Sequence, residues 1–198
     1  MNRAARIART LGWVALGLLM LATGTVRADS SEPTEYLDEE TAATITVVAQ
    51  PLVFAYAHRE LAANARDYAT VAAAAVNEAG KIHYVLILYF WSTVDPRLRT
   101  DAPPAAEPLA LQADDRSISL SLRGHSAHEA GIGIPVHAPP GNPVIPNVYS
   151  TDLPTLRYLV AAHRLSLRTD SGGAPQAYEL WEDRRAALRA FVQYMGGG

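Results

Sequence analysis

The sequence of 198 residues predicts a single, mainly β domain, and three observations lead to this prediction. Several short segments alternate apolar and polar residues with the period of two that half-buried strands require. Residues that favour turns separate these segments, and clear amphipathic helical periodicity occurs only in two stretches near the C-terminus. We therefore predict an immunoglobulin-like β-sandwich of about seven or eight strands with two short helices near the C-terminus.

The N-terminus has the features of a signal peptide at residues 1–28. Arg3, Arg6 and Arg9 precede an apolar run from Leu11 to Leu21. In the sequence Val26-Arg27-Ala28, small residues occupy the two positions that a signal peptidase recognises. An uncleaved anchor is the alternative, but this run is shorter than the ~20 apolar residues that a spanning helix needs. We predict cleavage near Ala28, a periplasmic or secreted location, and a mature chain without a membrane span. Residues 29–40 form a flexible segment, and residues 41–196 form the domain.

The next segments predict strands separated by one difficult region. Thr41 to Val48 and Leu52 to Tyr56 are rich in strand-forming residues, and Pro51 lies between them. Residues 58–79 are rich in alanine, which favours a helix, yet residues 68–76 alternate as in a strand. We expect a short helix at about 58–64 followed by a long hairpin, and one long helix is the alternative for residues 66–79.

The segment from Lys81 to Trp91 is apolar at nearly every position, which predicts a strand covered on both faces. Its aromatic residues also suggest a surface that binds a ligand or a partner, with Tyr84, Tyr89 and Trp91 as the candidates. Core packing is the alternative role for these rings.

The remaining elements follow from turn and cap signals. Residues 109–122 alternate around Asp114-Asp115 and predict a hairpin, and the many glycines and prolines in residues 124–148 predict a long irregular loop. Residues 151–160 predict a helix with Pro154 in its first turn. Two short strands at 164–168 and 177–181 and a final helix that begins near Asp183 complete the domain.

Composition excludes two classes of function and structure. Removal of the leader takes away four of the 17 basic residues and none of the 20 acidic ones, so the net charge changes from −3 to −7. Because positive charge supplies most of the affinity for phosphate backbones, the mature chain is not predicted to bind nucleic acid. The chain contains no cysteine, so disulfides and a lipid-modified N-terminus are excluded.

Three blocks of the sequence resemble uncharacterised exported proteins of proteobacteria. The blocks are residues 36–48, with the sequence YLDEETAATITVV, residues 64–68, with NARDY, and residues 89–95, with YFWSTVD. The resemblance implies that residues 68–76 form a strand. It implies no catalytic residues.

The long loop contains the only plausible candidates for chemistry. His125, His128 and His137 are spaced so that a loop can fold them around zinc, with Glu129 as a base for a bound water, but glycine and proline surround them and the helical zinc spacing is absent. Ser126 lies in a sequence that only approaches the nucleophile elbow of serine hydrolases. We assign no catalytic residue and predict no cofactor.

The sequence therefore favours an exported protein of the envelope that acts by binding and is not an enzyme. The predicted partner is an envelope protein or a small apolar ligand. The alternative is a metal-dependent hydrolase that uses His125, His128 and His137 to hold zinc.

Overall fold

A computed structural model of the chain describes residues 31–98, 102–139 and 144–197. The predicted signal peptide lies outside the described residues. The strands are β1 (Thr34–Asp38), β2 (Ala43–Val47), β3 (Leu52–Ala57), β4 (Arg66–Glu78), β5 (Lys81–Ser92), β6 (Pro104–Ala113), β7 (Arg116–Gly124), β8 (Pro146–Thr151), β9 (Leu165–Ser171) and β10 (Ala174–Glu182). The helices are α1 (Leu153–Ala161) and α2 (Arg185–Gly196), with short 3₁₀ helices η1 (Pro96–Leu98) and η2 (His128–Ala130).

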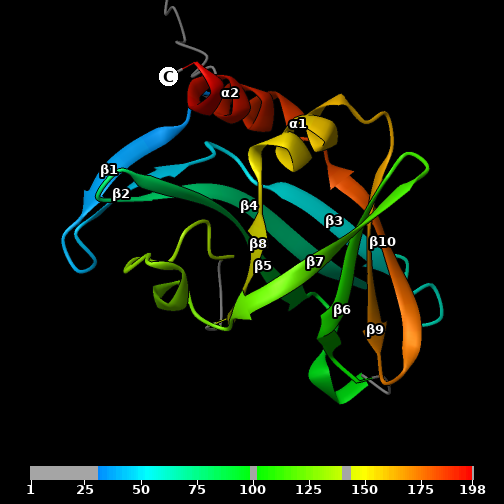
Figure 1. Cartoon of the computed structure of the whole chain (residues 1–198). Helices are drawn as coiled ribbons and strands as arrows, with labels where there is room; N and C mark the ends of the chain where they lie inside the picture. The colour runs from blue at the N-terminus through cyan, green and yellow to red at the C-terminus, as the bar shows by residue number, and fades with distance from the viewer. Residues whose placement is uncertain (1–30, 99–101, 140–143, 198) are drawn as a thin grey trace, which may run out of the picture.

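The sheet closes on itself, so the predicted β-sandwich is wrong. Eight antiparallel strands form a closed barrel in the order β4-β3-β10-β9-β6-β7-β8-β5, and β5 pairs back with β4 (Figure 1). Alternation along a strand is the same in a sandwich and in a barrel, because both bury one face of each strand. The fold is decided by pairings between segments far apart in the sequence, such as β3 with β10, and local patterns do not encode these.

Strands β1 and β2 form a hairpin outside the barrel because β4 is longer than β3. The first part of β4 pairs with β3 from Arg66 to Val71, and its later part pairs with β2 from Ala74 to Asn77. The sequence predicts that residues 29–40 are flexible, but the structure places β1 within this range and pairs it with β2 in regular register.

The register of the strands identifies the side chains that fill the barrel, since cross-strand partners point to the same side. Phe54 on β3 lies opposite Ala69 on β4 and Leu180 on β10. Large side chains that are fully buried in the interior are Phe54, Leu88, Leu111, Tyr149 and Tyr178. An apolar cavity of about 10 Å³ remains near the helices, lined in part by Leu159 of α1 and Leu188 of α2. This volume holds at most one water molecule, so the interior is a packed core.

The two predicted C-terminal helices are confirmed, and they lie together over one end of the barrel (Figure 1). Asp152 caps α1 by accepting a hydrogen bond from the Thr155 backbone N–H at 2.7 Å. Asp183 accepts from the backbone N–H of Arg185 at 3.1 Å, at the start of α2.

The long hairpin over residues 66–92 is confirmed, and the short helix at 58–64 is wrong. Residues 58–65 form turns, and the His58 N–H donates to the Ala65 carbonyl at 3.0 Å. Residues 72–75, all alanine, are buried in the middle of β4. Alanine prefers helix in isolated peptides, but pairing with strands on both sides overrides that weak preference.

The segment after β7 covers part of the outer face of β4 and β5. His83 Nε2 on β5 lies 3.2 Å from the Ala130 carbonyl oxygen, and His137 Nε2 lies 2.6 Å from the Val48 carbonyl oxygen. Ile132 and Val136 of this segment are buried. The prediction that β5 is covered on both faces is therefore confirmed for this part of the strand.

Candidate functional site

A group of aromatic and cationic side chains lies on the outer surface of the barrel, on strands β4, β5 and β10. We call this group the aromatic patch and define it as Arg66, Tyr68, Trp91 and Trp181. The covering segment after β7 contacts β5 near His83, and Trp91 lies toward the other end of this strand.

Strand register and one bulge place these side chains together. Tyr68 on β4 lies directly opposite Trp91 on β5. On β10 the pairing with β3 shifts, so that Leu180 lies opposite Phe54 and Glu182 lies opposite Val53. Trp181 is the extra residue of this bulge, and it is 53% exposed.

The rings are held in a fixed arrangement by contacts with one another. Tyr68 and Trp91 stack with ring centroids 4.2 Å apart and planes at 13°, and Trp91 Nε1 donates to Thr70 Oγ1 at 2.9 Å. Tyr68 meets Trp181 edge to face at 6.4 Å. The Arg66 guanidinium lies 4.7 Å from the centroid of the Trp181 ring. These contacts reduce the side-chain entropy that a binding partner would otherwise have to remove.

The patch combines apolar rings with charges of both signs. The Arg66 guanidinium stacks on Trp181, and its N–H donors have no hydrogen-bond or ion-pair partner among the described residues. Glu179 and Glu182 are exposed on either side of Trp181 along β10. Trp, Tyr and Arg are the residue types most enriched at energetic hot spots of protein interfaces. This arrangement can therefore bury against an apolar surface and donate to a carboxylate or a peptide carbonyl.

The structure separates the three aromatic residues that the sequence singles out. Trp91 belongs to the aromatic patch. Tyr89 is buried on the same outer face, and this burial raises the pKa of its phenol. Tyr84 lies opposite Ala75 and Thr151 on the inner face. Alternate residues of a strand point to opposite faces, so Tyr84 lies on one face of β5 and Tyr89 and Trp91 lie on the other.

Sequence reasoning missed Arg66 and Trp181 as members of the site. Arg66 begins β4, and its role depends on its contact with β10, more than a hundred residues later in the sequence. Trp181 is followed by Glu182 and Asp183, and acidic residues of this kind are typical of the start of a helix. The only available signal was a tryptophan next to polar residues at the end of an alternating segment.

The three candidate zinc ligands have three different partners. His125 Nδ1 lies 2.8 Å from Asn147 Oδ1, and His128 Nε2 lies 3.4 Å from Glu40 Oε1. His137 binds the Val48 carbonyl oxygen at the far end of the covering segment. Within residues 31–98, 102–139 and 144–197, no three His, Asp or Glu side chains converge as a metal site would require.

Ser126 and Glu129 stabilise a turn. Ser126 Oγ donates to Glu129 Oε1 at 2.9 Å, and the Glu129 N–H donates back to Ser126 Oγ at 3.2 Å. This reciprocal pair holds the turn that leads into η2. The Glu129 side chain also packs against Gly124, where an added Cβ would lie 2.0 Å from Glu129 Oε2.

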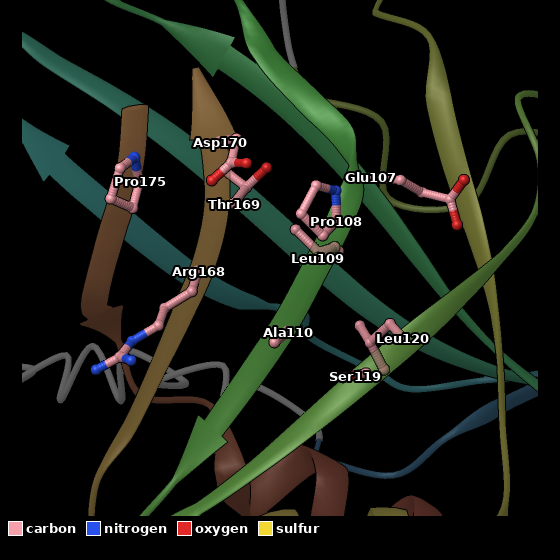
Figure 2. A pocket seen from close by; sticks show the side chains of 10 residues that line it. All are labelled: Glu107, Pro108, Leu109, Ala110, Ser119, Leu120, Arg168, Thr169, Asp170 and Pro175. Atoms are coloured by element: carbon pink, nitrogen blue, oxygen red, sulfur yellow. The ribbon is translucent and has the colours of Figure 1, made fainter. Parts of the chain in front are cut away.

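Apart from the aromatic patch, the surface has a hollow of about 590 Å³ between β10, β9, β6 and β7 (Figure 2). It forms where the pairing of β6 with β9 jumps from Pro104 to Leu109 and residues 105–108 leave the ladder. Figure 2 shows Arg168 and Glu107 extending in opposite directions from this hollow. Its charged groups therefore do not converge on one point, as they would in a specific site for a small ligand.

Comparisons of the chain with protein-family models, curated proteins and solved structures give no match. In the described part of the chain, no helix is both long and apolar enough to cross a membrane.

Proposed function

We propose that this chain is an exported, non-enzymatic binding module of the cell envelope, and that it engages a partner protein through the aromatic patch. The observation that carries the proposal is the ordered group of Arg66, Tyr68, Trp91 and Trp181, in which Trp181 is 53% exposed and the other three side chains are partly buried. The basic and apolar leader at residues 1–28 supports export, and the resemblance of three sequence blocks to exported proteobacterial proteins agrees with it.

The composition of the patch favours a protein partner. An exposed tryptophan loses the free energy that its burial would provide, about 25 cal/mol for each Å² of apolar surface left in water. A partner that covers Trp181 recovers this free energy at a small entropic cost, because the ring already rests against Tyr68 and Arg66. Arg66 then supplies directional hydrogen bonds.

A small apolar ligand fits the barrel less well than a protein partner does. The interior is filled by side chains such as Tyr149 and Tyr178, and the cavity near the helices is about 10 Å³. Drug-sized ligands occupy pockets of roughly 300–1,000 Å³. The hollow in Figure 2 is of that size, but Arg168, Asp170 and Glu107 line it.

Site-specific photocrosslinking in living cells tests the proposal. A photoreactive residue at position 181 should give a discrete adduct with a partner, and the same residue at position 82 should not. Ile82 on β5 is the matched control, because it is 49% exposed and lies at the opposite end of that strand from Trp91. Equal adducts at both positions, or none at position 181, would contradict the proposal.

Substitution of the patch gives a quantitative second test once the crosslinked partner is identified. Trp181→Ala removes a predicted hot spot, so we expect binding to weaken by about thirtyfold, which corresponds to ~2 kcal/mol. Arg66→Ala should also weaken binding, whereas Ile82→Ala should leave it unchanged. Unfolding curves of all three variants serve as the control for folding.

A further inference from the structure

Strand β1 forms an open edge of the sheet. Among the described residues it pairs only with β2, over Thr34 to Asp38, and the register is free of bulges. The backbone groups on its other side therefore have no strand partner in the described structure. Natural proteins usually protect such edges with lysine, proline or a bulge. None of these occurs within β1.

An apolar groove of about 310 Å³ lies beside this strand. Residues Thr34 and Tyr36 of β1 line it together with residues 47–49 at the end of β2, and the segment from Ile134 to His137 completes it. Ile134 is 61% exposed, and Leu37 on the opposite face of β1 is 66% exposed. Side chains of an added strand alternate between the two faces, so one set would meet the apolar groove and the other set would meet the face of β1 that carries Glu35 and Leu37.

The groove is preformed by hydrogen bonds that fix both of its sides. Asp38 accepts from the backbone N–H groups of Glu40 at 3.0 Å and of Gly133 at 2.5 Å. His137 adopts a left-handed backbone with φ of 50°, which is uncommon for a residue with a side chain, and its Nε2 lies 2.6 Å from the Val48 carbonyl oxygen. Glu35 accepts from Tyr194 of α2 and from Thr46.

The charged side chains on and next to β1 in the sequence are acidic. Between Arg27 and Arg59 the sequence contains no lysine or arginine. The exposed acidic residues on and next to β1 are Glu32, Glu35, Glu39 and Glu40, whereas Asp38 is buried. A second copy of this chain would bring the same negative charges to the interface, so like charges disfavour pairing of β1 with itself.

We propose that β1 and its groove bind an extended segment of a partner protein, in which basic residues alternate with apolar ones. The segment adds a strand to the edge of β1. Its backbone pairs with β1, its apolar side chains enter the groove beside Tyr36 and Ile134, and its basic side chains lie near the acidic residues of the hairpin. This surface is distinct from the aromatic patch, and the proposal does not depend on it.

Titration of the isotope-labelled protein with a synthetic peptide tests this inference. The probe is acetyl-KVKIKVKIK-amide, used where the peptide alone is unstructured, and acetyl-EVEIEVEIE-amide is its charge-reversed control. We expect the basic peptide to shift the amide resonances of residues 34–38 and of Ile134, Val136 and His137, and to leave those of the aromatic patch unchanged. Equal binding of both peptides, or no binding of the basic one, would overturn the proposal.

Two further comparisons separate strand addition from general attraction between charges. N-methylation of alternate peptide residues removes backbone donors while keeping every charge. Two peptides are compared, one methylated at the odd and one at the even positions. The peptide whose methylated residues would donate to β1 should no longer bind. Glu39→Lys should weaken binding by about threefold, as expected for a single charge near the rim of an interface. Glu179→Lys, an equal charge change on β10, should not weaken it.

Binding that survives methylation in both registers, or that Glu179→Lys weakens as much as Glu39→Lys does, would refute strand addition at β1. Sedimentation of the protein alone gives the last comparison. If the chain forms dimers that Leu37→Lys dissociates, the occupant of the edge is a second copy, and the proposal is wrong.

Discussion

Substitution of Phe54 by alanine should show that the barrel interior is a packed core and does not hold a ligand. The Phe54 side chain is fully buried and lies between Ala69 and Leu180 on the neighbouring strands. Its removal leaves a cavity on the order of 100 Å³, which costs about 2.4 kcal/mol at ~24 cal/mol per Å³, and lost transfer free energy adds roughly 2 kcal/mol. We therefore expect the free energy of unfolding to fall by about 3–5 kcal/mol.

Urea denaturation followed by tryptophan fluorescence measures this change. Phe54→Leu, which removes less volume, should cost about 1–2 kcal/mol and provides a folded variant if the alanine variant does not fold. Tyr194→Ala at the exposed surface should change stability by less than ~0.5 kcal/mol. Benzene should raise the unfolding temperature of Phe54→Ala and leave the wild type unchanged, because only the variant has an apolar cavity. A cost for Phe54→Ala below ~1 kcal/mol, or stabilisation of the wild type by benzene, would refute the packed interior.

Three further predictions concern packing, capping and pH. Ala74→Leu should destabilise the protein by about 1–3 kcal/mol in urea unfolding, because position 74 is buried on β4 between β2 and β5 and has no room for a larger side chain. Asp152→Ala should cost about 1 kcal/mol through loss of the α1 cap, whereas Asp115→Ala in the β6–β7 turn should cost much less. Backbone hydrogen bonds, chiefly from Gly133, lower the pKa of Asp38 below its ordinary value. Its contribution to stability is therefore present above the ordinary carboxyl pKa and is lost as pH falls through the lowered one, so acid unfolding of Asp38→Asn should depend less steeply on pH in this range.

Local features of the fold could be predicted from the sequence because nearby residues determine them. The turn between β4 and β5 is an example, since Asn77 Oδ1 accepts the Gly80 N–H at 2.9 Å and both Ala79 and Gly80 have positive φ. The cap of α1 at Asp152 is another. The exposed serines of β7 also follow directly from alternation.

Closure of the barrel could not be predicted in the same way. It depends on the pairing of β3 with β10, which joins segments more than a hundred residues apart. The candidate zinc site shows the same limit. His125 and His137 are close in sequence, but the covering segment is extended enough to place their partners at Asn147 and Val48.

Two aromatic residues on the outer face of β5 differ in burial, and this difference explains why the candidate site was only partly predicted. Tyr89 and Trp91 are two residues apart on the same face, and both are aromatic, so the sequence gives no reason to distinguish them. Tyr89 is buried, whereas Trp91 remains partly exposed and stacks on Tyr68. The position of the covering segment therefore decides which ring belongs to the core and which to the surface.

This difference bears on function because the fold does not require exposed rings. A polar side chain at Trp181 would satisfy the same bulge in β10 without leaving an indole in water. The arrangement instead keeps the indole exposed and orders it with Arg66 and Tyr68. Folding gains little from such a group, whereas association gains from burying it, so the aromatic patch is the part of this surface whose residue types are best explained by a partner.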